Sequence, residues 1–379
     1  MFIRSDESKL TGWYFEVDRR VLGGVILLTF IGMLEMISTG SAAADRIGMP
    51  WHFFILKMLP FYALGLGALF FTSCLDKKWV LRLSLMDVIG CMALLIITIV
   101  APIEIKGSHR WASIAGIRLM PSDLMKPGFI IMTAWFLGQM RQRFGSNMFL
   151  TRDAWQPRGY SWWTYLAMFV PAVLIIFLHP DFGTAILYFA VLGTMLFLAG
   201  LPWFIVWTFG AVAAMGGVVA FFTMSHVHTR VMNFFTGGGD HYQVDKSIAS
   251  IQHGGLIGSG DNAFVKEFLP DSHTDFVFAG IAEDVGAIAA CAMLGVFVYM
   301  MKLLRDNAVG ARDPFVFYAA GGTMALFGAQ ACINIMTALN LVPTKGMTLP
   351  FVSYGGSSYV SLCLLFGMVL AIIREDKWK

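Results

Sequence analysis

Ten long runs of apolar residues constrain the fold of this chain more than any other feature. A helix needs about 20 mostly apolar residues to cross the hydrocarbon core of a membrane. The runs are continuous and do not alternate, which argues against the strands of a membrane barrel. We therefore predict an all-α polytopic membrane protein with about ten transmembrane helices. The predicted spans are 21–42, 53–75, 79–101, 121–140, 161–178, 183–200, 202–225, 274–303, 314–339 and 349–373.

Composition agrees with this prediction. Hydrophobic residues make up 57% of the chain and charged residues 13%, about half of the ~25% charge that is usual in soluble domains. Such a chain has too little polar surface for a water-soluble enzyme or a disordered segment. The net charge of +3 gives no sign of nucleic-acid binding. The cysteines are scattered and form no metal or redox motif.

Lysine and arginine indicate the orientation. With the N-terminus inside, most of the 27 basic residues fall in inner segments, so we predict that both termini are cytoplasmic. The chain then divides into a tail at 1–20, a single membrane domain at 21–373 and a tail at 374–379. Two outer loops stand out, at 102–120 and 226–273. Loops of this length are usually functional.

Ionisable residues within or beside a span are costly and are therefore site candidates. Asp275 begins the eighth predicted span, beside the longest outer loop, and we expect it to be functional. Glu283 follows eight residues later, close to two helical turns, which predicts that the two carboxylates lie on similar faces. For Glu35, Lys57 and Asp87, a structural ion pair and a functional role both stay open.

Several basic residues gather on the predicted outer side, where the positive-inside rule disfavours them. They indicate an anionic ligand, because the arginine fork suits phosphate groups. Ordinary contact with lipid headgroups is the alternative. These residues are Lys106, Arg110, Arg118, Lys126, Arg230 and Lys345.

Two tracts of small residues give weaker signals. Gly254 and Gly255, with Gly258 and Gly260, do not form a nucleotide-binding loop, because no strand precedes them and no Lys-Ser/Thr pair follows. The tract at 353–358 opens the tenth span, where small residues suit either close helix contact or a ligand. The histidines of the long outer loop lack the spacing of a zinc hydrolase site, so a metal cage is not expected there.

Five motifs follow one another along the chain. They are Lys106–Trp111 with Pro121–Asp123 and Lys126; Pro180–Thr184; Tyr242-Gln243 with Ser247–Ala249 and Gly254-Gly255; Leu269–Phe276 with Ala282-Glu283; and Asn334 with Leu341–Ser358. In this order they resemble the SEDS family of bacterial cell-wall polymerases over essentially the whole chain. The Pro343–Gly346 segment is similar to the division branch of the family, since the elongation branch usually lacks its lysine. Asp123, His179 and Asp284 depart from the family pattern of Glu, Gln and Glu.

The resemblance implies an outer active site that polymerises lipid II into glycan strands during septal cell-wall synthesis, with inversion at the anomeric carbon. It implies that Asp275 is the catalytic base. The implied substrate-binding residues are Arg110, Lys126, Lys345, Gln243, His273, Glu283 and Ser357. Metal ligands stay unknown: a divalent cation, Mg²⁺ or Mn²⁺, is left open, and no organic cofactor is expected.

The resemblance also implies partners and a location. The partners are a class B penicillin-binding transpeptidase of the FtsI type and other divisome membrane proteins, with no nucleic acid. The location is the bacterial cytoplasmic (inner) membrane at the division septum. Two other functions are weighed: a lipid II flippase, which needs a charged path across the bilayer, and a non-enzymatic scaffold that recruits the transpeptidase. Clustering of charge on the outer side favours the polymerase.

Overall fold

Helices account for nearly all of the regular structure, as predicted. The computed structural model describes residues 9–100, 111–114, 117–157, 159–179, 182–236, 242–343 and 346–378. The long helices are α2 (Arg19–Arg46), α3 (Phe53–Ser73), α4 (Lys77–Val100), α6 (Lys126–Phe144), α7 (Trp162–Leu178), α8 (Phe182–Leu198), α9 (Trp203–Thr223), α12 (Val277–Val309), α13 (Pro314–Ala338) and α14 (Gly356–Trp378). The shorter elements are α1 (Lys9–Glu16), α5 (Pro121–Leu124), α10 (Ser225–Thr236), α11 (Tyr242–Gly254) and the 3₁₀ turns η1 (Gly145–Asn147), η2 (Arg152–Trp155), η3 (Gly260–Asn262) and η4 (Val265–Phe268).

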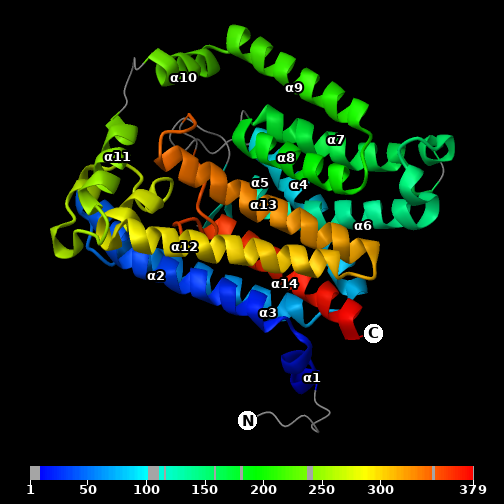
Figure 1. Ribbon diagram of the computed structural model, residues 1–379, viewed down its shortest axis with the longest axis horizontal. Helices are drawn as coiled ribbons and strands as arrows, with labels where there is room; N and C mark the ends of the chain where they lie inside the picture. The colour runs from blue at the N-terminus through cyan, green and yellow to red at the C-terminus, as the bar shows by residue number, and fades with distance from the viewer. Residues whose placement is uncertain are drawn as a thin grey trace.

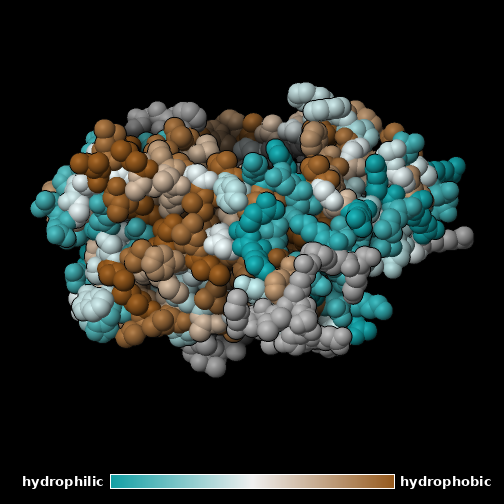
Figure 2. Space-filling view, turned by 60° about the horizontal axis from the view of Figure 1, so that its bottom comes forward, coloured by the Kyte–Doolittle hydropathy of each residue, from teal (hydrophilic) through white to brown (hydrophobic). Residues whose placement is uncertain are grey.

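Within the described residues, six helices are long and apolar enough to cross a membrane: α2, α3, α4, α12, α13 and α14. Apolar stretches in α7, α8 and α9 are shorter. Figure 2 shows a broad hydrophobic face that gives way to hydrophilic residues toward both ends of the molecule. The all-helical, multi-pass architecture is confirmed, whereas the count of ten spans and the cytoplasmic placement of both termini remain predictions.

Two predicted spans differ from the observed helices. The run at 121–140 is split into α5 and α6, because Pro127 has no amide hydrogen to donate to the carbonyl of Asp123, which accepts the Ser361 hydroxyl instead. The tenth helix begins at Gly356 rather than 349, since the preceding residues form turns in which Phe351 has a φ of 65°. The predicted outer loop at 102–120 contains an unpredicted hairpin, in which β1 (Ala112–Ile114) pairs antiparallel with β2 (Ile117–Leu119).

The helices form an interior group and a periphery. In Figure 1, α2, α12, α13 and α14 run side by side, with α9 and α10 along the upper edge, away from α2 and α14. The most apolar part of α14 is 83% buried, against 22% for α3. Helix α14 therefore lies in the core of the bundle, while less than a quarter of the residues in the apolar part of α3 are buried.

One end of the bundle is tied by the last residues of α14, and we call this group the C-terminal clamp. The Glu375 carboxylate accepts the Lys77 amide, 2.8 Å away, at the start of α4. The Asp376 carboxylate accepts two amides just before α13, at 3.0 and 3.1 Å. The Lys377 amine donates to Asn307 Oδ1 over 2.6 Å, and Asn307 Nδ2 donates to Asp18 Oδ2 over 3.0 Å. The clamp thus joins α2, α4, α12, α13 and α14.

Candidate active site

The Asp275 carboxylate stands on a turn, not on a helix. Helix α12 begins at Val277, and Asp275 lies in the preceding turn, residues 271–276, where it is half-buried. The turn closes because the carbonyl of Asp271 accepts the amides of Thr274, Asp275 and Phe276 at 3.1, 3.1 and 3.3 Å. Helical spacing therefore does not relate Asp275 to residues within α12, and the prediction that it shares a face with Glu283 is wrong.

The loop between α13 and α14, residues 339–355, lies next to the Asp275 carboxylate at Gly346. A Cβ added to Gly346 would lie 3.1 Å from Asp275 Oδ2, so glycine at this position leaves room for the carboxylate beside the loop backbone. Asn334 of α13 donates to the carbonyls of both Asp275 and Met347, over 3.0 and 2.6 Å. The predicted contact Lys345 precedes Gly346 directly but lies outside the described residues, as does Arg110.

His273 joins the same two segments through aromatic contacts. Its ring lies 4.3 Å from that of Phe54 in α3 and 5.4 Å from that of Tyr354, measured between centroids. The Tyr354 amide donates to the His273 carbonyl over 2.8 Å, and burial raises the pKa of the Tyr354 phenol. His273 therefore sits two residues from Asp275 and fixes the turn against the 339–355 loop.

Glu283 lies in the interior, with a side chain that is 0% exposed. Its carboxylate accepts the Val265 and Lys266 amides at 2.7 Å each and contacts His253 Nδ1 at 2.9 Å. The Ser250 hydroxyl also donates to it. A buried carboxylate needs such donors, because desolvation of an unpaired charge is costly. Glu283 thus holds α11 and η4 onto α12.

Asp284, the neighbouring acid, holds η4 through a side chain instead of the backbone. It forms an ion pair with the Lys266 amine, and Ser38 of α2 donates to its Oδ2 over 2.6 Å. Lys266 also donates to the Ser38 hydroxyl. The two adjacent acids consequently clip both the backbone and the side chain of η4, and tie this region to α2.

Helix α12 is broken at Gly286, and the glycine tract at 254–260 fills the break. Gly286 has φ 83° and ψ 170°, a conformation essentially reserved for glycine. The amides of Ala287 and Ile288, freed by the break, donate to the carbonyls of Gly255 and Leu256 at 2.9 and 3.2 Å. The glycine tract at 254–260 therefore supplies backbone carbonyls to the amides that the break leaves unpaired. We call residues 242–286 the α11 cap.

The break in α12 depends on a contact between glycines that the sequence pattern of one helix does not encode. Gly258 also has a positive φ, of 88°, and a Cβ there would lie 2.3 Å from the Asp284 carbonyl. A Cβ on Gly286 would lie 2.4 Å from the Gly258 amide nitrogen. Two glycine positions far apart in sequence thus touch backbone to backbone, which periodicity within one helix cannot reveal.

Lys126 and Ser357 hold a second part of the candidate site. The Lys126 amine is 2.6 Å from Asp123 Oδ1, and its side chain is 6% exposed. Ser357, at the start of α14, accepts the Met120 amide over 3.0 Å, while Ser361 donates to the Asp123 carbonyl over 2.6 Å. Short helix α5 is therefore seated on α14 by backbone contacts.

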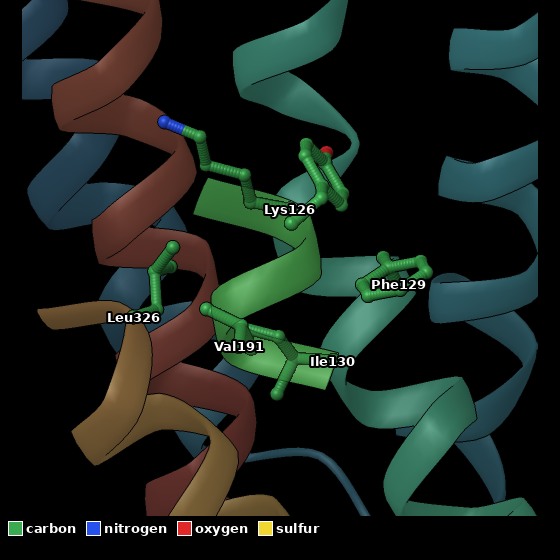
Figure 3. A pocket seen from close by; sticks show the side chains of 6 residues that line it. Lys126, Phe129, Ile130, Val191 and Leu326 are labelled. Atoms are coloured by element: carbon green, nitrogen blue, oxygen red, sulfur yellow. The ribbon is translucent and has the colours of Figure 1, made fainter. Parts of the chain in front are cut away.

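Beneath Lys126 lies a small apolar hollow between α6, α8 and α13 (Figure 3). In Figure 3 the Lys126 amine points away from the apolar side chains of Phe129 and Ile130. The stem of Lys126 thus covers apolar surface while its charge is directed elsewhere, as long basic side chains commonly do. The residues that line the hollow are Lys126, Phe129, Ile130, Tyr188, Val191 and Leu326.

The remaining sequence candidates are spread over the bundle. Gln243 lies half-buried near the start of α11. Lys57 places its amine 4.1 Å from the centroid of the Phe53 ring, and Asp87 accepts the Gly128 amide over 2.9 Å. Among the described residues, no group of three or more His, Cys, Asp or Glu side chains gathers in a way that could hold a metal ion.

Sequence relatives cover nearly the whole chain. The sequence profile of a family described as "Cell cycle protein", which spans FtsW, RodA and SpoVE, matches residues 19–378. The "Probable peptidoglycan glycosyltransferase FtsW" of Caulobacter vibrioides is 35% identical over 377 residues, which cover 99% of this chain and 93% of that protein. The protein of the same name from Thiomicrospira cyclica is 31% identical over 385 residues, with 96% and 94% covered.

Solved structures show the same fold. A chain from a structure described as "Structural coordination of polymerization and crosslinking by a peptidoglycan synthase complex" matches with a TM-score of 0.77 and 22% identity, covering 96% of this chain and 99% of that one. The rod shape determining protein RodA of Thermus thermophilus matches with a TM-score of 0.66 at 22% identity, with 96% and 98% covered. Full-length kinship in sequence and agreement in fold lead to one conclusion: the chain belongs to the FtsW/RodA/SpoVE family of cell cycle proteins, the SEDS family.

Proposed function

We propose that this protein is a peptidoglycan glycosyltransferase that polymerises lipid II into glycan strands, with its reaction centre at the Asp275 turn. The observation that carries the site assignment is the position of the Asp275 carboxylate, half-buried and set against Gly346. The activity is supported by full-length relatives that are named peptidoglycan glycosyltransferases.

The chemistry needs a base and a cationic site. A sugar hydroxyl must attack an anomeric carbon while the lipid-linked pyrophosphate leaves, so one group accepts the hydroxyl proton and another stabilises the charge of the leaving group. Asp275 takes the proton. Direct displacement with one base inverts the anomeric centre, from an α donor to a β product. A general base typically contributes ~100- to 10,000-fold to the rate.

Lys126, with Arg110 and Lys345, stabilises the departing pyrophosphate. Lys126 is paired with Asp123 at 2.6 Å, and a pyrophosphate carries more negative charge than one carboxylate, so the amine can turn to the substrate when it binds. No step of this proposal requires a divalent cation, and the binding of Mg²⁺ or Mn²⁺ stays an open part of the proposal.

The other predicted contacts divide into two groups. Gln243 and His273 contact the substrate in this proposal. Ser357 and Glu283 instead support the site without contacting the substrate, because they accept the backbone amides of Met120, Val265 and Lys266. They keep α5 and the α11 cap in place around the reaction centre.

The site faces the outer side of the bacterial cytoplasmic membrane, in a bundle of ten spans with both termini inside. Positive charge in the inner segments supports this orientation. The partner is a class B penicillin-binding transpeptidase of the FtsI type, within a divisome of other membrane proteins at the septum. The fold likeness to a chain of a peptidoglycan synthase complex supports such a partner, and relatives named FtsW support the division role.

The test is polymerisation of labelled lipid II by the purified chain, with and without the transpeptidase. A ladder of glycan strands supports the proposal. A flippase would instead move labelled lipid II across vesicle membranes without making strands. A scaffold would do neither, and its recruitment of the transpeptidase would survive loss of Asp275. Either of these two outcomes would contradict the proposed activity.

A further inference from the structure

We infer that Asn334 is a positioning residue, whose side-chain amide sets the Asp275 turn and the 339–355 loop in one register. The inference rests on the proposed function of Asp275 as the base. Asn334 is fully buried in α13. Its Nδ2 donates to the Asp275 carbonyl over 3.0 Å and to the Met347 carbonyl over 2.6 Å. One side chain thus bridges two segments that are far apart in the sequence.

The chemistry of this bridge requires an amide nitrogen. An asparagine Nδ2 has two hydrogens, and here each goes to a carbonyl of a different segment. With the amide turned over, its oxygen would face two carbonyl oxygens. Among the described residues, Asn334 Oδ1 has no hydrogen-bond partner, so the donor side alone fixes the orientation. Aspartate has the same shape but presents oxygen where the two hydrogens are needed.

The bridge by Asn334 matters because Met347, one of its two acceptors, is next to the glycine that faces the Asp275 carboxylate. Gly346 precedes Met347, and its missing Cβ would stand 3.1 Å from Asp275 Oδ2. Holding the Met347 carbonyl therefore also holds the backbone against which the carboxylate is set. When a reacting group is misplaced by about 1 Å, the rate falls on the order of 100-fold. Asn334 acts through Asp275 and need not touch the substrate.

Helix α13 offers a matched control one turn away. Gln330 is 2% exposed, and its Nε2 donates to the Thr348 carbonyl over 3.0 Å and to the Ser358 hydroxyl over 3.2 Å. Among the described residues its hydrogen bonds go to Thr348 and Ser358, so it fastens the same loop without bonding to the Asp275 turn. Gln330→Glu and Asn334→Asp make the same isosteric change at similar depth, so both carry the cost of a buried acid. Only Asn334→Asp removes a hydrogen bond to the Asp275 carbonyl.

The experiment compares wild type, Asn334→Asp and Gln330→Glu in lipid II polymerisation, with thermal unfolding measured on each. We expect kcat of Asn334→Asp to fall by about 30-fold or more with KM within about 3-fold, as for loss of an interaction that serves the transition state. For Gln330→Glu we expect kcat within about 5-fold of wild type at a similar loss of melting temperature. Equal kcat values for the two variants, or a change confined to KM, would overturn the inference.

Gly346→Ala keeps the inference testable if Asn334→Asp does not fold. Its Cβ would push the carboxylate by a few tenths of an ångström, and we expect kcat to fall by about 10-fold with KM unchanged. A wild-type kcat for Gly346→Ala would then overturn the inference. An inactive wild type, by contrast, would contradict the proposed function itself, so the two failures are distinguishable.

Discussion

The α11 cap and the C-terminal clamp are both rich in charged groups, yet they differ in how far those groups are buried. In the clamp, the side chains of the Lys77–Asp313 pair are 24% and 26% exposed, and Lys377, which pairs with Asp18, is 46% exposed. In the cap, Glu283 is 0% exposed and receives two backbone amides besides its side-chain donors. Carboxylates accept backbone amides in both regions, but the cations of the clamp are partly exposed, whereas the central carboxylate of the cap is fully buried.

The difference indicates which region has to keep a fixed geometry. Ion pairs between exposed side chains contribute about 0–1 kcal/mol and weaken with salt. A buried carboxylate cannot lose its charge without leaving donors unpaired, at about 1–3 kcal/mol for each donor. The cap therefore tolerates little displacement, which suits the region that carries Asp275 and Gly286. The clamp needs only to keep helix ends together.

The largest expected effect comes from Gly286→Ala. Its φ of 83° is strained for alanine, and the new Cβ would lie 2.4 Å from the Leu256 carbonyl oxygen. We expect the cap to detach from the break in α12, with loss of polymerisation and fast amide exchange at Ala287 and Ile288. Gly295→Ala is the control, because nothing lies within 4 Å of its Cβ, and it should be neutral or stabilising by up to about 1 kcal/mol. Equal behaviour of the two variants would refute a structural role for the break.

Glu283→Gln should have the next largest effect. Glutamine keeps one oxygen but turns an amide nitrogen toward donors, so we expect a loss of stability of about 3 kcal/mol and at least a 10-fold loss of activity. The measurement is thermal unfolding together with strand synthesis. Glu267→Gln removes the same charge from an exposed position on η4 and should change neither by much. Wild-type stability of Glu283→Gln would mean that the cap is not held by this carboxylate.

The sequence predicted those features of the fold and the site that depend on residues close together in the chain, and missed those that depend on distant residues. Apolar runs are local signals, and they predicted the helices, whereas the role that the basic residues suggest for the outer segments stays a prediction. The turn at Asp275 was misread as a helix start, because its closure depends on the Asp271 carbonyl in an unusual conformation, with φ 53°. The burial of Glu283 and the bridge by Asn334 involve partners 13 to 59 residues away, which no short-range pattern encodes.

The smallest expected effect belongs to the clamp. Burial raises the pKa of Asp18, but the hydrogen bond from Asn307 and the charges of Lys377 and Arg20 outweigh burial, so its pKa lies below the usual value. A lowered pKa stabilises the fold above the unfolded pKa of about 4, and this contribution is lost as the pH falls through the folded value.

Asp18→Asn should therefore lower stability at pH 7 by no more than about 1 kcal/mol. The gap to wild type should narrow progressively when thermal unfolding is repeated as the pH falls below the unfolded value of about 4. A gap that persists in acid would show that the charge of Asp18 is not what stabilises the clamp.

The central claim is that the Asp275 carboxylate accepts the proton in strand synthesis. Its most direct test is the turnover of labelled lipid II by purified Asp275→Asn beside Asp271→Asn, which removes a carboxylate from the same turn while asparagine keeps the left-handed conformation there. We predict that both variants fold, that Asp271→Asn makes glycan strands, and that Asp275→Asn loses ~100- to 10,000-fold in rate. Near-normal strand synthesis by Asp275→Asn would contradict the claim.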